Sequence, residues 1–222
     1  FGPLDLGKVH LFCKELEKAR VKANTSSYWK NWCRVYLDGE VGSLEGACIP
    51  DWKEINSIPN EARLIGAGLD FGYSIDPSSM CLLYKYNDGY IFDEVLYQTG
   101  MLNRDISNFI KNNNIDCNIY ADSAEPKSIA EIRLSGVDIF PVTKGRDSIV
   151  YGINLINQNE VFVTSKSKNL KKELEGYVWM KDRQGNTLQK PNPMTGDHAI
   201  DSIRYAMMMV LENPNRGEYH LF

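Results

Sequence analysis

The sequence predicts an α/β protein with a mixed central β-sheet flanked by helices on both faces. Its composition is globular, since 43% of the 222 residues are hydrophobic and 24% are charged, which is enough for a substantial core. Three apolar strand patterns follow one another at residues 64–97, and Asn87-Asp88-Gly89 between two of them is a typical hairpin turn. Helix and strand patterns then alternate, which requires crossover connections and parallel pairing.

Each predicted element follows from its own pattern. Mostly apolar residues predict strands at 64–71, 79–86 and 90–97. Ile106, Phe109 and Ile110 share one face of a helix predicted over 103–113. Strands are then expected at 119–122, 137–142 and 161–163, helices at 126–135, 148–157, 168–175 and 198–211, and a two-stranded hairpin from 177–180 and 183–187.

Residues 1–62 differ from residues 63–222. They combine a short charged helix at 10–23, a stretch rich in Tyr and Trp at 27–37, and extended connectors at 49–52 and 58–60. We interpret residues 1–62 as an N-terminal linker or extension that packs on a main domain of residues 63–222. Because the first residue is Phe1 and not Met, we expect the chain to be part of a longer protein.

Cysteine usage and hydropathy exclude several classes of protein. The five cysteines are scattered, without a C-x-x-C pair, so a zinc site or a disulfide framework is not expected and reduced thiols in a cytosol are favoured. No apolar run approaches the roughly 18 residues that a membrane span needs. The net charge of −4 does not indicate a nucleic-acid-binding protein. It does not exclude one either, because phosphate contacts depend on local basic patches and not on the net charge of the chain.

Three carboxylates occupy positions that suit a metal site. Asp70 and Asp122 end two strand patterns, and Asp201 lies in the first turn of the last helix. If the two strands are neighbours, these carboxylates meet at one edge of the sheet and offer the oxygen ligands that Mg²⁺ or Mn²⁺ prefers. Two such ions about 4 Å apart can activate a water and stabilise the leaving oxygen of a phosphodiester. The alternative is that Asp70 and Asp122 merely end strands.

Two neighbours of Asp201 have open roles. His198 shares the side of Asp201 on the helix, and it is a metal ligand, a general acid or base, or a first-turn residue without chemistry. Asp197 follows Gly196 at the helix start, where capping is slightly favoured over metal binding.

Four stretches carrying these residues resemble the nuclease domain of the terminase large subunit of tailed bacteriophages. They are Gly68-Leu69-Asp70-Phe71-Gly72, Ala121-Asp122-Ser123-Ala124-Glu125-Pro126, Lys144-Gly145-Arg146-Asp147-Ser148-Ile149 and His198-Ala199-Ile200-Asp201-Ser202-Ile203-Arg204-Tyr205-Ala206. The resemblance covers about residues 64–212. It implies an RNase H-like fold and a metal-dependent endonuclease that cuts concatemeric viral DNA during genome packaging. Asp70, Asp122 and Asp201 match the acidic positions of that family, and His198 matches a histidine often present there.

The resemblance also implies partners and a location. They are double-stranded DNA, the terminase ATPase domain of the same full-length chain, the small terminase subunit and the portal, in the cytoplasm of the infected bacterial host and without a membrane. Residues 2–8 spell G-x-x-x-x-G-K, but Val9 stands where a phosphate-binding loop needs Ser or Thr for magnesium. We therefore expect no ATPase activity from this chain.

Basic side chains near these motifs are candidates for phosphate contacts. They are Lys144, Arg146, Lys181 and Arg183. Lys144 is the strongest candidate because it falls within a family motif. A further basic run at 166–172 is equally well explained as a solvated surface. The hairpin that carries Lys181 and Arg183 has two further candidate roles, which are gating the site and touching the ATPase domain.

Two other functions remain open. The first is an ATP-binding module of the actin and sugar-kinase type, which shares such a sheet but usually needs a second domain and a glycine-rich adenosine motif, neither evident here. The second is a docking module that contacts a viral portal and has lost cleavage. The intact set of three carboxylates argues against it.

Overall fold

The computed structural model describes residues 17, 20–21, 33, 46–193 and 196–212. Almost all of the charged helix and the aromatic stretch expected before residue 46 lie outside the described residues. Within them, no helix is both long and apolar enough to cross a membrane. The cysteines that the structure describes, Cys33, Cys48, Cys81 and Cys117, are free thiols.

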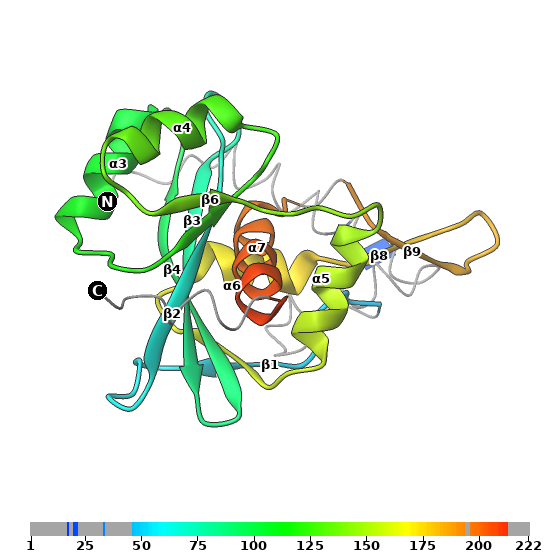
Figure 1. Cartoon of the computed structure of the whole chain (residues 1–222). Coiled ribbons are helices and arrows are strands. Elements are labelled where there is room, and N and C mark those ends of the chain that lie inside the picture. The colour runs from blue at the N-terminus through cyan, green and yellow to red at the C-terminus, as the bar shows by residue number, and fades with distance from the viewer. Residues whose placement is uncertain (1–16, 18–19, 22–32, 34–45, 194–195, 213–222) are drawn as a thin grey trace, which may run out of the picture.

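A seven-stranded mixed sheet forms the centre of the molecule (Figure 1), in the order β1-β7-β4-β3-β2-β5-β6. Strands β2, β3 and β4 form an antiparallel meander, β5 and β6 continue in parallel beyond β2, and β7 and β1 continue in parallel beyond β4. The strands are β1 Trp52–Ile55, β2 Arg63–Asp70, β3 Ser78–Tyr86, β4 Gly89–Gln98, β5 Ile119–Ala121, β6 Ile139–Pro141 and β7 Val161–Thr164. The predicted mixed sheet is thus confirmed.

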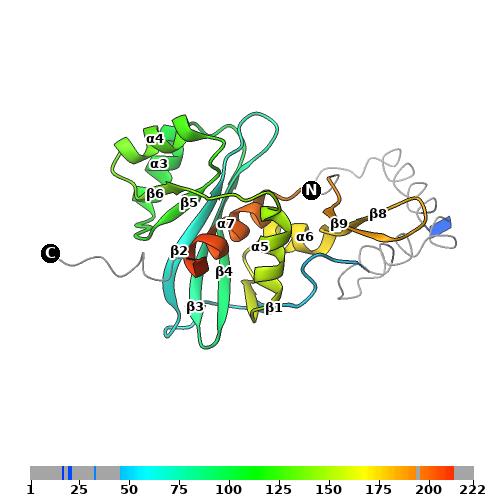
Figure 2. The same ribbon diagram turned by 45° about the vertical axis from the view of Figure 1, so that its right-hand side comes forward.

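Helices cover both faces of this sheet because successive side chains of its strands point to opposite sides. In β3, Met80 and Leu82 join a core with helices α3 and α4, whereas Cys81 and Leu83 join a core with α5, α6 and α7. Figure 2 shows these two groups of helices apart, on either side of the sheet. The helices are α3 Asn103–Asn112, α4 Pro126–Leu134, α5 Ser148–Asn157, α6 Lys168–Gly176 and α7 His198–Glu212.

The edge of the sheet differs from the sequence prediction. Residues 49–52 are predicted to be a connector, but Trp52–Ile55 forms strand β1 and pairs with β7, more than a hundred residues later. Cys48 and Ile49, just before it, are buried in the core. A four-residue strand with exposed central residues leaves only a weak pattern in the sequence, and its pairing partner is too distant to be recognised from local signals.

Helix α7 lies directly on strand β2, next to the centre of the sheet. A Cβ atom on Gly68 would lie 1.8 Å from the backbone oxygen of Ser202, so the helix backbone and the strand backbone are in contact at this point. The hydroxyl of Ser202 also donates a hydrogen bond to the carbonyl of Ser79 on β3, at 2.9 Å. Glycine is therefore required at position 68 for close approach and not for an unusual backbone angle.

We expect Gly68→Ala to lower the free energy of unfolding by about 3 kcal/mol or more, because the new methyl group meets backbone that cannot rotate away. Urea denaturation measures this loss. Gly145→Ala is the matched control, since nothing lies within 4 Å of the Cβ it would add. Equal stability of the two variants would contradict the direct contact.

Candidate functional site

The two strand carboxylates lie side by side at one end of the sheet. Strands β2 and β5 are parallel neighbours, and Leu69 is paired with Ala121. Asp70 is the last residue of β2 and Asp122 directly follows β5, so both residues lie at the same end of the sheet. Because the first turn of α7 begins over this edge, Asp201 approaches from the helix side.

The hydroxyl of Tyr205 joins two of the three carboxylates. It lies 3.0 Å from Oδ2 of Asp201 and 3.3 Å from Oδ2 of Asp122. The Tyr205 side chain is buried between α7 and β5, in a small cluster with Tyr120, so its hydroxyl is held in place. The side chains of Asp122 and Asp201 therefore converge on one fixed atom.

Asp70 is held by His198, the first residue of α7. The Nδ1 atom of His198 lies 3.0 Å from Oδ2 of Asp70, and its Nε2 atom lies 3.6 Å from Oδ1 of Asp76. The imidazole thus lies between two carboxylates. This contact links the end of β2 to the start of α7.

Two basic side chains balance the remaining carboxylate charge. The ammonium of Lys144 lies 2.7 Å from Oδ1 of Asp122 and 3.1 Å from the Tyr205 hydroxyl. The guanidinium of Arg204, which is buried, lies 2.6 Å from Oδ1 of Asp201. Among the described residues, no three His, Cys, Asp or Glu side chains are grouped closely enough to hold a metal ion as they stand.

The carboxylates differ in their ionisation. Burial raises the pKa of Asp70 to about 6, although its hydrogen bond with His198 opposes the rise, and the negative charge of Asp201 adds to it. The hydrogen bond with Asp70 raises the pKa of His198 to about 9 against the effect of burial. Burial alone would also raise the pKa of Asp122, but the Ala124 amide and the Lys144 ammonium outweigh it and lower that pKa. At neutral pH the site therefore holds an ionised Asp122 beside Lys144 and a charged His198 beside Asp70.

Comparison with known proteins identifies the family. A family model described as "Terminase RNAseH like domain" matches residues 70–208, more than half of the chain. The chain belongs to the terminase RNase H-like domain family. The matched segment contains all three carboxylates, His198 and Lys144.

Individual relatives agree with this family. The chain is 30% identical over 149 residues to the terminase large subunit of Bacillus phage SPP1. The alignment covers 64% of this chain and 35% of the SPP1 protein, so this chain spans about a third of the relative's length. Its fold is similar to the SPP1 nuclease domain, with a TM-score of 0.60 and 24% identity over 70% of this chain and 94% of that one. The large terminase of a thermophilic bacteriophage gives a TM-score of 0.57 and 20% identity, over 72% of this chain and 43% of that one. These matches confirm the predicted RNase H-like fold.

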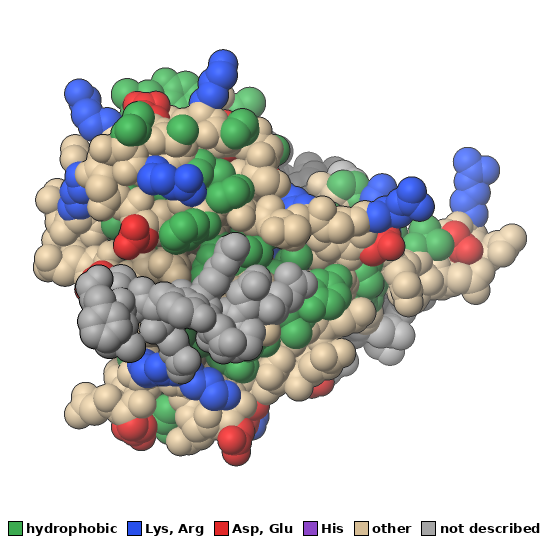
Figure 3. All heavy atoms as spheres, viewed as in Figure 1, with side chains coloured by type: hydrophobic (Ala, Val, Ile, Leu, Met, Phe, Trp, Pro, Cys, Tyr) green, Lys and Arg blue, Asp and Glu red, His purple; other side chains and the backbone are tan. Residues whose placement is uncertain are grey.

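The candidate DNA-binding side chains of this terminase domain lie in two places. Lys144 is at the carboxylates themselves, and Arg146 is exposed two residues further along the same loop. Lys181 and Arg183 are exposed on the hairpin formed by β8 (Trp179–Lys181) and β9 (Thr187–Pro191), which projects from the body in Figures 1 and 2. Among the residues that the structure describes, Figure 3 shows Lys and Arg side chains scattered over this face, including the hairpin, and not gathered into one patch.

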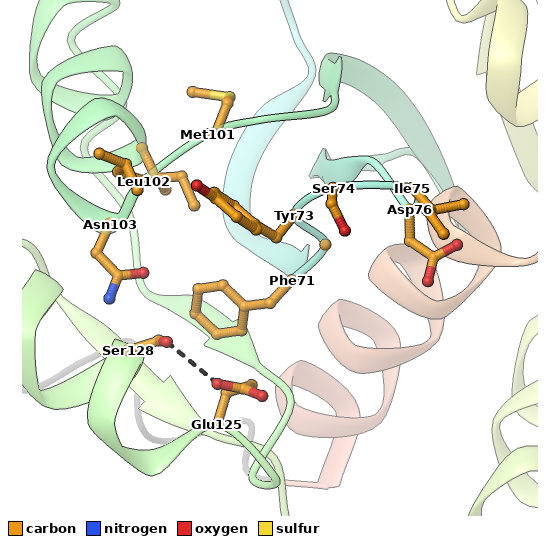
Figure 4. A pocket seen from close by; sticks show the side chains of 12 residues that line it. Phe71, Tyr73, Ser74, Ile75, Asp76, Met101, Leu102, Asn103, Glu125 and Ser128 are labelled. Atoms are coloured by element: carbon orange, nitrogen blue, oxygen red, sulfur yellow. Dashed lines mark hydrogen bonds between the residues drawn. The ribbon is translucent and has the colours of Figure 1, made fainter.

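An open cavity of about 510 Å³ adjoins the carboxylates on the side of α3 and α4 (Figure 4). Its wall begins at Phe71, directly after Asp70, and the rings of Phe71 and Tyr73 face it together with Met101 and Leu102. Asp76, which also lies near His198, is part of the lining. The hollow beside the site therefore combines apolar side chains with polar ones, among them the carboxylates of Asp76 and Glu125.

Three residues around the site were not identified from the sequence. The sequence candidates were Asp70, Asp122, Asp201, His198 and the four basic residues. Tyr205 and Arg204 follow Asp201 on α7 and contact it, and Glu173 of α6 binds the start of α7. A signal for Glu173 was available, because it falls on the same helix face as the buried Leu170 and Leu174. A carboxylate on an apolar face must have partners to be buried.

The raised pKa of His198 predicts how the free energy of unfolding of the metal-free protein changes with pH. A group whose pKa is about 9 in the folded protein and 6.5 in the unfolded chain stabilises the fold fully below pH 6.5 and loses this effect as the pH rises through 9. His198→Asn keeps a donor for Asp70 without the charge. We expect the difference in unfolding free energy between wild type and variant to shrink from pH 6.5 to 9.5, measured by urea denaturation with EDTA. A constant difference would show that the charged imidazole contributes nothing.

Proposed function

We propose that this chain is a metal-dependent DNA endonuclease that cuts concatemeric viral DNA during genome packaging. The observations that support the proposal are that Asp70 and Asp122 lie at the ends of the paired strands β2 and β5, and that the hydroxyl of Tyr205 lies within hydrogen-bond distance of both Asp122 and Asp201. Family membership supports a nuclease role, and the related SPP1 nuclease domain has been solved with bound Mn. The reaction is phosphodiester hydrolysis with two divalent ions, Mg²⁺ or Mn²⁺.

The donor set fits such ions. Three carboxylates supply hard oxygen atoms, and each has a second oxygen besides the one bound to its basic or imidazole neighbour. The close basic groups show how strongly this edge attracts positive charge, since Lys144 and His198 both lie against its carboxylates. When bound, the ions supply a polarised water and stabilise the negative charge that develops on the phosphate.

The protein's own side chains have distinct roles in this proposal. Asp70, Asp122 and Asp201 bind the ions, and His198 either joins them as a ligand or orients Asp70. The hydroxyl of Tyr205 fixes Asp122 and Asp201 relative to each other. Lys144 has a long, mobile side chain that is 31% exposed, so its ammonium is able to turn from Asp122 to a phosphate of the bound DNA.

DNA is held by positively charged side chains outside the sheet. Lys144 and Arg146 contact phosphates next to the cut, and Lys181 and Arg183 extend this contact along the hairpin. These contacts position the duplex without reading its sequence. The remaining partners are the ATPase domain of the full-length chain, joined through residues 1–62, together with the small terminase subunit and the portal in the host cytoplasm.

Removing any one carboxylate tests the site directly. We expect Asp70→Ala, Asp122→Ala and Asp201→Ala each to lower the rate of plasmid cleavage in Mn²⁺ or Mg²⁺ on the order of 1000-fold, because metal-assisted stabilisation is worth several kcal/mol. EDTA should stop the wild-type reaction. Gel assays of nicking and linearisation measure the rates, with thermal melts to show folding.

Asp88→Asn, in the exposed turn between β3 and β4, is the matched control and should cut at the wild-type rate. A folded Asp122→Ala variant that cuts normally would remove the proposed site. Persistent cleavage in EDTA would remove the metal mechanism.

The hairpin residues are tested through the salt dependence of DNA binding. We expect the double variant Lys181→Ala/Arg183→Ala to bind duplex DNA more weakly and to reduce the slope of log affinity against log salt by about 2, one for each lost phosphate contact. Fluorescence anisotropy with a catalytically inactive background measures the slope. The control is Arg63→Ala/Lys85→Ala, a pair at the far end of β2 from Asp70. If the hairpin variant changes cleavage but leaves the slope unaltered, the hairpin gates the site and does not hold DNA.

A further inference from the structure

We propose that Glu173 of α6 is a positioning residue for the nuclease site, because its buried carboxylate caps the N-terminus of α7 and fixes the place of His198 and Asp201. The capping contact stands on the structure alone. Its effect on metal binding rests on the proposed function.

The carboxylate occupies the place of a helix cap. Its Oε2 atom accepts hydrogen bonds from the amides of Ala199 at 2.8 Å and Ile200 at 3.1 Å. Ala199 and Ile200 are the second and third residues of α7. Amides at these positions have no partner within a helix and are normally bound by the side chain of the residue that precedes the helix. Asp197 is that preceding residue, and its backbone carbonyl accepts from the Asp201 amide. The sequence favoured Asp197 as the capping residue of this helix. At these two amides, the structure has Glu173 in that role.

A cap from another helix acts differently from a local one. An Asp197 side chain would satisfy the amides wherever α7 lay, whereas Glu173 ties the start of α7 to α6. The carboxylate is only 8% exposed, so the attraction between its charge and the positive end of the helix is weakly screened. The position of the first turn of α7 therefore depends on the position of Glu173.

Glu173 is itself held from the sheet. Its Oε1 atom accepts a hydrogen bond from the hydroxyl of Tyr97 on β4, at 2.8 Å. Glu94, also on β4, binds the start of α6 through the Leu170 amide and the Asn169 side chain, both at 2.6 Å. Two buried or half-buried carboxylates thus connect the sheet to α6 and α6 to α7.

The start of α7 determines the geometry of the site. His198 is the first residue of the helix and contacts Asp70, and Asp201 follows one turn later. Gly68 sets the distance of α7 from the sheet, while Glu173 fixes the end of the helix that carries the ligands. Loss of a residue that orients metal ligands typically costs 10- to 100-fold in metal affinity or activity.

The experiment compares Glu173→Ala with Glu173→Gln. The alanine variant loses the acceptor for both amides, whereas glutamine keeps a carbonyl oxygen in the same place. We expect Glu173→Ala to weaken Mn²⁺ binding to the DNA-free protein about tenfold by calorimetry, and to speed hydrogen exchange in the first turn of α7 about tenfold. Glu173→Gln should stay within about threefold of wild type in both measurements.

Val163→Ala is the stability control. This residue is fully buried in the same core but lies on β7, away from the carboxylates. It should lower the melting temperature without changing Mn²⁺ affinity. If it weakens Mn²⁺ binding as much as Glu173→Ala at equal stability, the effect is general loosening and the proposal is overturned.

The exchange measurement separates this proposal from the proposed function. Unchanged exchange at the start of α7 in Glu173→Ala would overturn the positioning role, whatever the metal data show. Faster exchange in a protein whose wild type binds no Mn²⁺ would support the positioning role and contradict the metal site. If Glu173→Ala does not fold, the Tyr97→Phe variant replaces it. Tyr97→Phe removes the hydroxyl that donates to Oε1 of Glu173, so it should produce the same changes in exchange and Mn²⁺ affinity at a smaller size. Wild-type exchange and wild-type Mn²⁺ affinity in Tyr97→Phe would overturn the proposal.

Discussion

The contact between α7 and the middle of the sheet is the constraint on which the site depends. Two of the carboxylates belong to β2 and β5, and their mutual position follows from the register of those parallel strands. The third belongs to a helix more than seventy residues further along the chain, and no strand pairing places it. The absence of a side chain at Gly68 lets α7 approach until its backbone touches β2, which brings Asp201 within reach of the strand carboxylates. A larger residue at that one position would move the helix together with His198 and Asp201.

Three neighbouring carboxylates repel one another when they are ionised. Positively charged side chains around them offset this repulsion. Each carboxylate has its own partner: His198 for Asp70, Lys144 for Asp122 and Arg204 for Asp201. Arg204 is buried and its guanidinium stays charged, so it is a fixed counter-charge for Asp201, whereas the side chains of Lys144 and His198 are partly exposed. The site therefore combines one buried counter-charge with two that are partly open to solvent.

The sequence predicted the parts of this architecture whose signals are local. Alternating and continuous apolar patterns located β2, β3, β4 and α7, and a carboxylate at the end of a buried strand is visible without knowing its neighbours. Strand β1 was not predicted because its four residues carry little pattern and pair with a distant strand. Tyr205 and Glu173 were not assigned for a related reason. Tyr205 looks like an ordinary helical residue, since a hydroxyl that joins two carboxylates depends on tertiary structure alone. The place of Glu173 on the apolar face of α6 indicates a buried carboxylate but does not identify its partners.

The arrangement separates rigid from adaptable functions. The carboxylates stand on elements packed into the two cores, and Glu173 ties the one helix among them to its neighbours through buried contacts. The candidate DNA-binding residues stand instead on a loop and on a projecting hairpin, both exposed. A metal site needs donors fixed to within a fraction of an ångström, so it belongs on strands and a capped helix. The phosphate contacts that we propose for the exposed residues make the opposite demand, because contacts made by long, exposed lysine and arginine side chains form and break without disturbing the core.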